Sequence, residues 1–359
     1  MAQTAASFAL PAHLNRARAV LLAFAVLAVG ASLAALATGP AQLGVDRIVT
    51  LLVQPLGIDT GIAVDRGQSA IFWSLRLPRL FVGFLVGAGL AVAGTLMQGL
   101  SRNPLADPGL LGASGGAGAA SVSVIVLGGG FVAGLPAGLQ PFALPVAAFL
   151  GAMAATAIVY RIGTRAGRTV MATLLLAGIA VGTVAQAQIG FMVFISDDTQ
   201  LRVLNFWLLG GLAGALWTML LPLAAFVCAG LAIAMTVARP LNTLALGESE
   251  AGHLGTNVQG FKRLIAVIAS LMVGAAVAVA GIIGFVGLVV PHIVRRLTGP
   301  DHRYVLPGSA LLGGGLLVLA DIFARTVVAP AELPIGIVTA AIGGPFFIFL
   351  LLRHFRGAI

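Results

Sequence analysis

The sequence predicts an all-α, polytopic membrane protein, and three observations carry this prediction. Hydrophobic residues make up 59% of the 359 residues and charged residues only 9%, whereas soluble domains carry roughly 25% charged residues. The run from Leu80 to Leu100 contains no charged residue, and about 21 residues at 1.5 Å per residue suffice to cross a hydrocarbon core of about 30 Å. Glycine, at 48 residues, is frequent enough to let helices pack closely in lipid.

Ten apolar runs follow one another along the chain, and each is expected to form a transmembrane helix, some of them short or broken. They cover residues 19–38, 80–100, 109–128, 142–160, 170–194, 218–238, 264–283, 286–297, 304–328 and 335–352. The eighth is too short for a straight span and carries Gly284, Gly287 and Pro291, which predicts a broken or half-depth helix. The segment from Leu201 to Trp217 is expected to be a short interfacial or re-entrant helix.

The first apolar run has a second interpretation as a signal peptide. Arg16 and Arg18 precede it, and Ala35-Leu36-Ala37 resembles a cleavage site. Its length exceeds that of a typical signal-peptide core and favours a retained span. The expected fold is therefore one transmembrane domain over residues 1–359.

The arginines orient these spans, because positive residues are retained on the cytoplasmic side of a membrane protein. If both termini are cytoplasmic, all but six of the 20 lysines and arginines fall on cytoplasmic loops, the six being Arg47, Arg66, Arg76, Arg79, Arg202 and Arg325. Loop arginines thus account for the net charge of +9, and no nucleic-acid partner is expected. The single cysteine, Cys228, can form no internal disulfide.

The chain lacks the residues that would power transport. Its only lysine, Lys262, lies between Phe261 and Arg263, so the nucleotide-binding loop that ends in Gly-Lys-Ser or Gly-Lys-Thr is absent. Ion-coupled carriers place carboxylates or histidines inside their spans, but here only Asp321 lies well inside one. Arg325, four residues on, either neutralises Asp321 or shares a function with it. We expect another subunit to supply the energy, and this chain not to be an enzyme.

A polar island at about residues 240–260 separates the sixth and seventh spans. Gly247 and Gly255 bracket a short stretch with Glu248 and Glu250 in its first turn, where a helix dipole favours negative charge. The island is either a short cytoplasmic helix between two turns or a solvated loop.

Six segments, in order along the chain, resemble the FecCD-type permeases of ABC importers, which carry iron-siderophores, haem or cobalamin across the bacterial inner membrane. GFVGLVVPH and the island sequence are the most specific of them, whereas residues before Arg16 and the loop from Gly39 to Ser74 contain no matching motif. The segments are RLPR at 76–79, NPLADPGLLG at 103–112, LALGESEAGHLG at 244–255, GFVGLVVPHIVR at 284–295, LADIFAR at 319–325 and ELPIG at 332–336.

The resemblance implies an assembly around this chain. It implies a homodimeric permease in the bacterial inner membrane with both termini cytoplasmic, two ATP-binding cassette subunits below and a periplasmic substrate-binding protein above. ATP and Mg would be bound by the ATPase subunits, and this chain would bind no cofactor. His292 is attractive as a haem or metal ligand, but it lies in the shared motif and no second ligand is spaced to join it, so no metal site is expected.

The resemblance also implies roles for particular positions. The island would be the coupling helix that enters a cleft of the ATPase through Gly247, Glu248, Ala251, Leu254 and Gly255. A cytoplasmic gate would comprise Asn103 and Leu105, with a second constriction at Met171, Ala172 and Thr173. That constriction departs from the family pattern, because apolar residues stand where hydroxyls are expected.

Arginines at the outer face are expected to dock the binding protein. Arg76 and Arg79 lie three residues apart and share a helix face, and by resemblance they join Arg325 in a basic pocket that receives a glutamate of the binding protein. The alternative is that all three anchor helix ends at the lipid headgroups.

The cargo is the least determined feature. The island sequence and the FWLLGGL segment at 206–212 are most similar to the haem branch, which makes haem the expected cargo. Ferric siderophore and cobalamin remain alternatives. For the function class, the more remote alternatives are an ion-coupled secondary transporter and a non-transporting scaffold.

Overall fold

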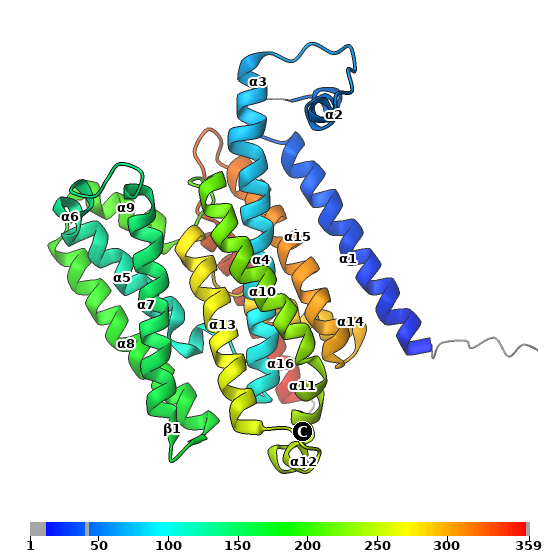
Figure 1. Ribbon diagram of the computed structural model, residues 1–359, viewed down its shortest axis with the longest axis vertical. Helices are drawn as coiled ribbons and strands as arrows, with labels where there is room; N and C mark the ends of the chain where they lie inside the picture. The colour runs from blue at the N-terminus through cyan, green and yellow to red at the C-terminus, as the bar shows by residue number, and fades with distance from the viewer. Residues whose placement is uncertain (1–11, 40–42, 357–359) are drawn as a thin grey trace, which may run out of the picture.

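The structure, a computed structural model, describes residues 12–39 and 43–356 as a bundle of helices (Figure 1). Ten main helices coincide with the ten predicted spans, which confirms the all-α fold. They are α1 (Ala12–Ala37), α4 (Leu77–Ser101), α5 (Ala113–Leu127), α7 (Gln140–Gly163), α8 (Met171–Ile195), α10 (Trp217–Thr236), α13 (Val258–Ala280), α14 (Val286–Thr298), α15 (His302–Thr326) and α16 (Ile335–Arg356).

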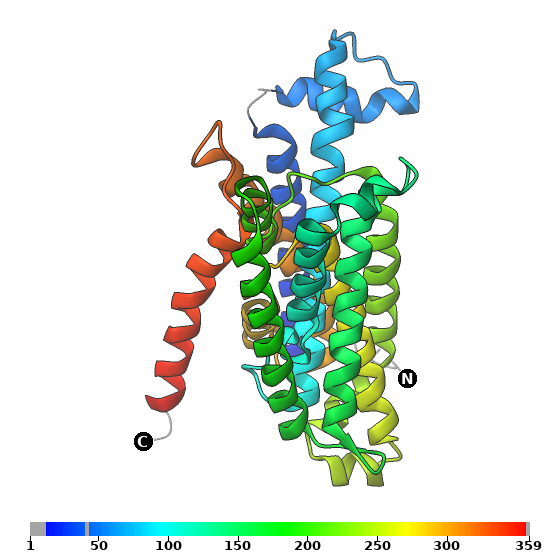
Figure 2. The same cartoon turned by 90° about the vertical axis from the view of Figure 1, so that its left-hand side faces the viewer.

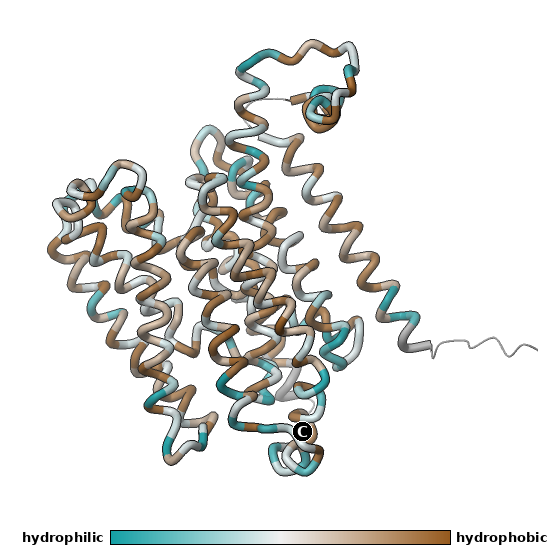
Figure 3. The backbone as a smooth tube through the Cα atoms, in the orientation of Figure 1, coloured by the Kyte–Doolittle hydropathy of each residue, from teal (hydrophilic) through white to brown (hydrophobic). Residues whose placement is uncertain are grey.

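By length and composition, 7 of the described helices could cross a membrane, and α5 and α16 form shorter apolar helices. The eighth predicted span is indeed short: α14 has 13 residues and follows a non-helical stretch at 281–285. Hydropathy follows the same arrangement, because brown apolar segments run along the helices and teal polar ones gather toward their ends (Figure 3).

Shorter elements connect these helices. The segment predicted at 201–217 is helical at Asp198–Leu208 (α9), where Asp197 and Gln200 form a reciprocal cap, and non-helical at 209–216. The other short elements are α2 (Val45–Val53), η1 (Gln54–Leu56), α3 (Arg66–Ala70), η2 (Ile71–Arg76), η3 (Pro108–Leu111), α6 (Gly129–Ala133), the hairpin β1 (Thr164–Arg165) and β2 (Arg168–Thr169), α11 (Ala238–Leu244) and α12 (Glu248–His253).

The second span differs from its predicted start at Leu80. An unbroken helix of 36 residues runs from Arg66 to Ser101, so that Arg76 and Arg79 lie within it. Pro78 has no N–H and would clash with the preceding turn of a regular helix. The chain relieves this with a π-helical turn at Ile71–Arg76, where the Leu77 N–H bonds to the Phe72 carbonyl.

Helix α4 forms the centre of the bundle and packs against α10, α13, α14 and α15 (Figure 1). Its glycines allow backbones to touch. A Cβ atom at Gly94 would overlap the carbonyl oxygen of Gly287 in α14, and one at Gly87 would overlap that of Gly313 in α15. These close approaches hold α4, α14 and α15 together as one packed group.

A second group consists of α5, α7 and α8, the green and teal helices of Figure 1, and contacts the first mainly through α7 and α13. The two ends of the molecule differ. At one end α2 and α3 rise above the bundle, and at the other lie α12 and the β1–β2 hairpin (Figures 1 and 2). We call these the α2 end and the α12 end. The first turns of α1 and the last turns of α16 lie toward the α12 end (Figure 2).

Candidate functional site

The predicted coupling loop contains a short helix at the α12 end (Figure 1). Gly247, with φ +132, leads into α12, and Gly255, with φ +84, leads out of it. Only glycine adopts such backbone angles without strain, so the two glycines fix both turns. Of the two interpretations of the island, the helix between turns is confirmed.

The residues in and beside α12 differ in their exposure to solvent. Ala251 is fully buried, whereas Leu254 is 63% exposed and Leu246, just before Gly247, is 69% exposed. Ala251, which was expected to contact an ATPase, has its side chain packed inward, where it supports the helix. Two exposed leucines on a polar turn form the outward apolar surface of this element. The sequence prediction missed Leu246, although LALG places it directly before the turn.

Glu248 is half-buried, and its carboxylate bonds toward the bundle. Its Oε2 lies 2.7 Å from Nζ of Lys262, and the same Nζ donates to the Thr169 carbonyl at 2.9 Å. The Lys262 side chain is 2% exposed. We call Lys262, Glu248 and Thr169 the Lys262 junction. It was not predicted, and the only hint of it in the sequence is that Lys262 is the single lysine.

The predicted gate residues lie on two segments that both begin or end toward the α12 end. Asn103 is exposed in the turn after α4, and its Oδ1 accepts a bond of 2.9 Å from the Leu105 N–H. Met171, Ala172 and Thr173 form the first turn of α8, where Ala172 and Thr173 are exposed. The η3 turn, which follows the Asn103 turn, packs against α8 and so connects the two segments.

Two of the three predicted docking arginines, Arg79 and Arg325, meet at Asp321 toward the α2 end, whereas Arg76 lies one helical turn from Arg79 and bonds to the end of α1. Arg79 donates to both oxygens of Asp321 at 2.8 to 3.1 Å and to both oxygens of Glu332 at 3.0 Å. The expected Asp321–Arg325 pair is present but longer, at 3.7 Å. We call Arg79, Asp321, Arg325 and Glu332 the Arg79 cluster. The role of Glu332 was not predicted, although it opens the ELPIG segment.

These arginines are occupied within the chain. Arg76 donates to the carbonyls of Leu36 and Ala37, and Arg325 donates to the Ala35 carbonyl at 2.6 Å. Arg76 is 5% exposed and Arg325 6%. Both guanidinium groups thus bind the last turn of α1, which leaves Arg79 and its Glu332 partner as the outermost part of the predicted docking surface.

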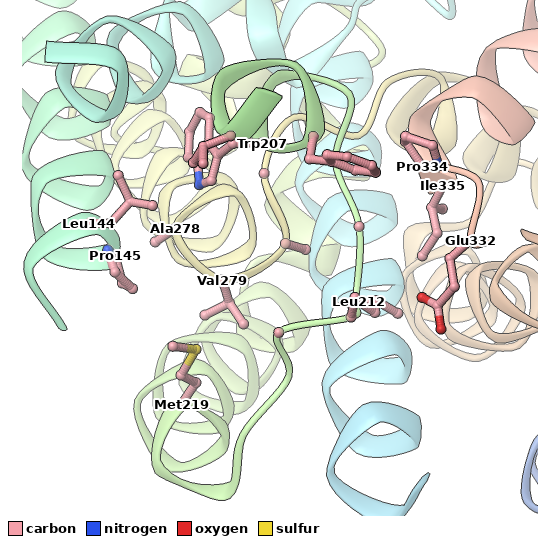
Figure 4. Close-up of a pocket in the computed structure, with 18 of the residues that line it drawn as sticks. Leu144, Pro145, Trp207, Leu212, Met219, Ala278, Val279, Glu332, Pro334 and Ile335 are labelled. Carbon is pink, nitrogen blue, oxygen red and sulfur yellow. The ribbon is translucent and has the colours of Figure 1, made fainter. Parts of the chain in front are cut away.

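A cavity of about 490 Å³ opens beside the Arg79 cluster, below α9 (Figure 4). Glu332 lies on one side of it and Leu144 and Pro145 on the opposite side, with Trp207 above (Figure 4). Arg79 also lines it. The walls are mostly apolar and carry the Arg79–Glu332 ion pair and Arg202, which suits a large molecule with an apolar body and a few charged groups.

His292, considered as a ligand, lies on α14 with its ring 6.2 Å from that of Phe346. Its Nε2 atom is buried and has no hydrogen-bond partner in the described part of the chain. Among residues 12–39 and 43–356, no three histidine, cysteine or acidic side chains are grouped to hold a metal ion.

Comparisons with known proteins agree with this geometry. The FecCD transport family model matches residues 27–353. Over 284 residues the chain is 46% identical to the hemin transport system permease protein HmuU of Yersinia pestis, covering 79% of this chain and 84% of that protein. It is 43% identical over 297 residues to the vitamin B12 import system permease protein BtuC of Salmonella typhimurium, covering 81% and 86%.

Solved structures show the same fold. A metal-chelate type ABC transporter in an inward-facing conformation superposes with a TM-score of 0.79 at 28% identity, covering 94% of this chain and 99% of that one. PsaBC from Streptococcus pneumoniae, in complex with Fab, superposes with a TM-score of 0.54 at 16% identity over 76% of this chain and 89% of that one, a likeness of fold alone.

Proposed function

Because the chain belongs to the FecCD transport family, we propose that it is the permease subunit through which an ATP-driven importer moves an iron chelate, with haem as the cargo. It is a multi-pass membrane permease of the ABC importer class. The observation that carries the proposal is the family match over residues 27–353, which agrees with a short helix, α12, flanked by two exposed leucines at one end of the bundle.

Energy would come from two ATP-binding cassette subunits at the α12 end, where Leu246 and Leu254 would enter a cleft of each ATPase. A short helix held by the buried Ala251 and by the Glu248–Lys262 bond suits this role, because a force on it is passed to the helices beneath. Gly247, Glu248 and Ala251 would hold α12 in place, and Gly255 would set its exit. ATP and Mg would stay in the ATPase, and this chain would carry no cofactor.

The α2 end would face the periplasm and the α12 end the cytoplasm of a bacterial inner membrane. Both termini would then be cytoplasmic, as the arginine distribution indicates. A second copy of the chain would complete the path, with Asn103, Leu105 and the residues Met171, Ala172 and Thr173 forming its cytoplasmic gate.

A periplasmic binding protein would dock at the α2 end. The clustering of Arg76, Arg79 and Arg325 supports this, and Arg79 lies nearest the surface beside the open cavity. A glutamate of the binding protein would compete with Glu332 for Arg79. Such an exchange would favour orientation and rapid association more than affinity.

Haem is proposed as the cargo because HmuU is 46% identical and the adjoining cavity combines an apolar wall with an ion pair. The competing cargo is cobalamin, since BtuC of Halobacterium salinarum is 45% identical over 288 residues, covering 80% of this chain and 75% of that protein. A ferric siderophore is the third candidate.

Vesicle uptake tests the proposal. The chain is co-expressed with an ATP-binding cassette subunit and reconstituted, and uptake of haem, cobalamin and ferric siderophore is measured with the matching binding proteins. ATP-dependent uptake of haem alone is the expected result. Cobalamin uptake without haem uptake would refute the haem assignment, and uptake driven by an ion gradient without any ATPase would refute the importer assignment.

A further inference from the structure

The Lys262 junction lies where the two helix groups meet, and it ties α12 to that meeting point. Lys262 is the fifth residue of α13, in the group built around α4. Thr169 ends the hairpin that leads into α8, in the group of α5, α7 and α8. Glu248 is the first residue of α12. One ammonium group therefore bonds the proposed coupling helix and the entrance to α8 at the same time, at 2.7 and 2.9 Å.

The β1–β2 hairpin is held in place by several hydrogen bonds, so a shift of one part of it is passed on to α8. The Thr169 N–H donates to Gln259 Oε1 at 2.9 Å, and the Thr169 hydroxyl bonds to the Tyr160 hydroxyl at 3.1 Å. The Val170 N–H bonds to the Gly163 carbonyl at 3.0 Å. Thr169 thus lies two residues before Met171 in a short, cross-bonded turn, so a displacement of its carbonyl displaces the first turn of α8.

The α12 side is held as well. Ala251 is fully buried under α12, and its carbonyl accepts a bond of 2.9 Å from the Thr256 N–H. Glu248 follows directly on Gly247, so its carboxylate moves with the helix. Hydrogen bonds and burial therefore hold both the helix and the hairpin near the points where Lys262 joins them.

Because Lys262 is buried, its ammonium group needs the hydrogen bonds to both Glu248 and Thr169. A charged amine removed from water is costly unless it is paired and hydrogen-bonded, and Lys262 is 2% exposed. If α12 moved while the hairpin stayed, the ammonium would lose its carboxylate partner Glu248 and keep only the Thr169 carbonyl. The stable arrangement is one in which α12 and the hairpin move together.

We propose that Lys262 is a positioning residue that couples displacement of α12 to displacement of the first turn of α8, where Met171, Ala172 and Thr173 lie. This inference rests on the proposed function, since it requires an ATPase to push α12. It assigns Glu248 an internal role, as an anchor for Lys262, in place of a direct contact with the ATPase.

The test measures the amount of cargo taken up per ATP hydrolysed, not the rate of uptake alone. In reconstituted vesicles, Lys262→Met keeps the apolar stem and removes the charge, and Lys262→Arg keeps the charge. We expect Lys262→Met to lower the cargo taken up per ATP hydrolysed by about fivefold or more, and Lys262→Arg to restore part of it. Arg263→Met, the neighbouring exposed cation, is the matched control and should leave the ratio unchanged.

A purely supporting role predicts a different result, because loss of folded protein lowers uptake and hydrolysis together and leaves their ratio intact. Equal ratios in Lys262→Met and the wild type would overturn the inference. If Lys262→Met fails to assemble, Glu248→Gln takes its place: the Glu248 side chain is 39% exposed, so the amide can hydrate. The variant must lower the ratio for the inference to stand. Absence of ATP-driven uptake in the wild type would refute the proposed function instead.

Discussion

Removal of Arg79 is expected to destabilise the folded chain by about 3–5 kcal/mol, the cost of leaving a buried charge without its partner. The charge left without its partner is the carboxylate of Asp321. Its side chain is 6% exposed and accepts three hydrogen bonds of 2.8 to 3.1 Å from Arg79. In Arg79→Met, Asp321 would keep only Arg325, at 3.7 Å, which is beyond hydrogen-bond distance.

Glu332 should contribute little to this loss. Its side chain is 36% exposed, so it can rehydrate when Arg79 is absent, and pairs of this kind are worth about 0–1 kcal/mol. Glu332→Gln is therefore the matched control. Unfolding of the purified chain in mixed micelles of increasing SDS content measures both variants, and adding Asp321→Leu to Arg79→Met should recover most of the stability.

Two results would refute this account. One is an Arg79→Met variant within about 0.5 kcal/mol of the wild type, the range of an ordinary surface substitution. The other is a Glu332→Gln variant as unstable as Arg79→Met. Any test of docking at Arg79 must include this measurement, because an acidic substitution there would disturb the Arg79 cluster as well as the docking surface.

Two further predictions concern packing and pH. Gly94→Ala should cost about 1–3 kcal/mol or more in the same unfolding assay because its Cβ would overlap the Gly287 backbone, whereas Gly30→Ala, with no atom within 4 Å, should be neutral or slightly stabilising. Burial alone would raise the pKa of Asp301, but hydrogen bonds from Arg303 outweigh it and hold this pKa at about 2. This stabilisation is present above pH about 4 and lost as the pH falls toward 2, so thermal unfolding at pH 3 should show a larger loss for the wild type than for Asp301→Asn; equal losses would contradict it.

The spans could be predicted from sequence because burial in lipid is a property of composition over a window, and each run carried that signal by itself. The start of the second span could not be predicted in this way. Arg76, Pro78 and Arg79 are residues that normally end a span, yet the π-helical turn absorbs the proline and the arginines find partners within the protein.

The sequence could not predict which distant residues form hydrogen bonds with one another. Arg79 bonds to Asp321, 242 positions away, and Lys262 bonds to Thr169, 93 positions away. No periodic pattern encodes such pairs, which depend on how helices pack. The sequence did show that Asp321 was unusual inside a span and that Lys262 was the only lysine, so it identified the residues without their partners.

Any motion that opens the path must occur between the two helix groups, not within the group around α4. In that group Gly87 and Gly94 bring backbones into direct contact, so a shift of α4 against α14 or α15 would drive carbonyls into neighbouring atoms. Between α7 and α13 the nearest atoms belong to side chains: a Cβ atom added at Gly274 would meet side-chain atoms of Ala152 and Met153 at 3.2 Å. Side-chain contacts can slide where backbone contacts cannot. The Lys262 junction crosses this same boundary, so a push on α12 would be delivered where the fold can yield.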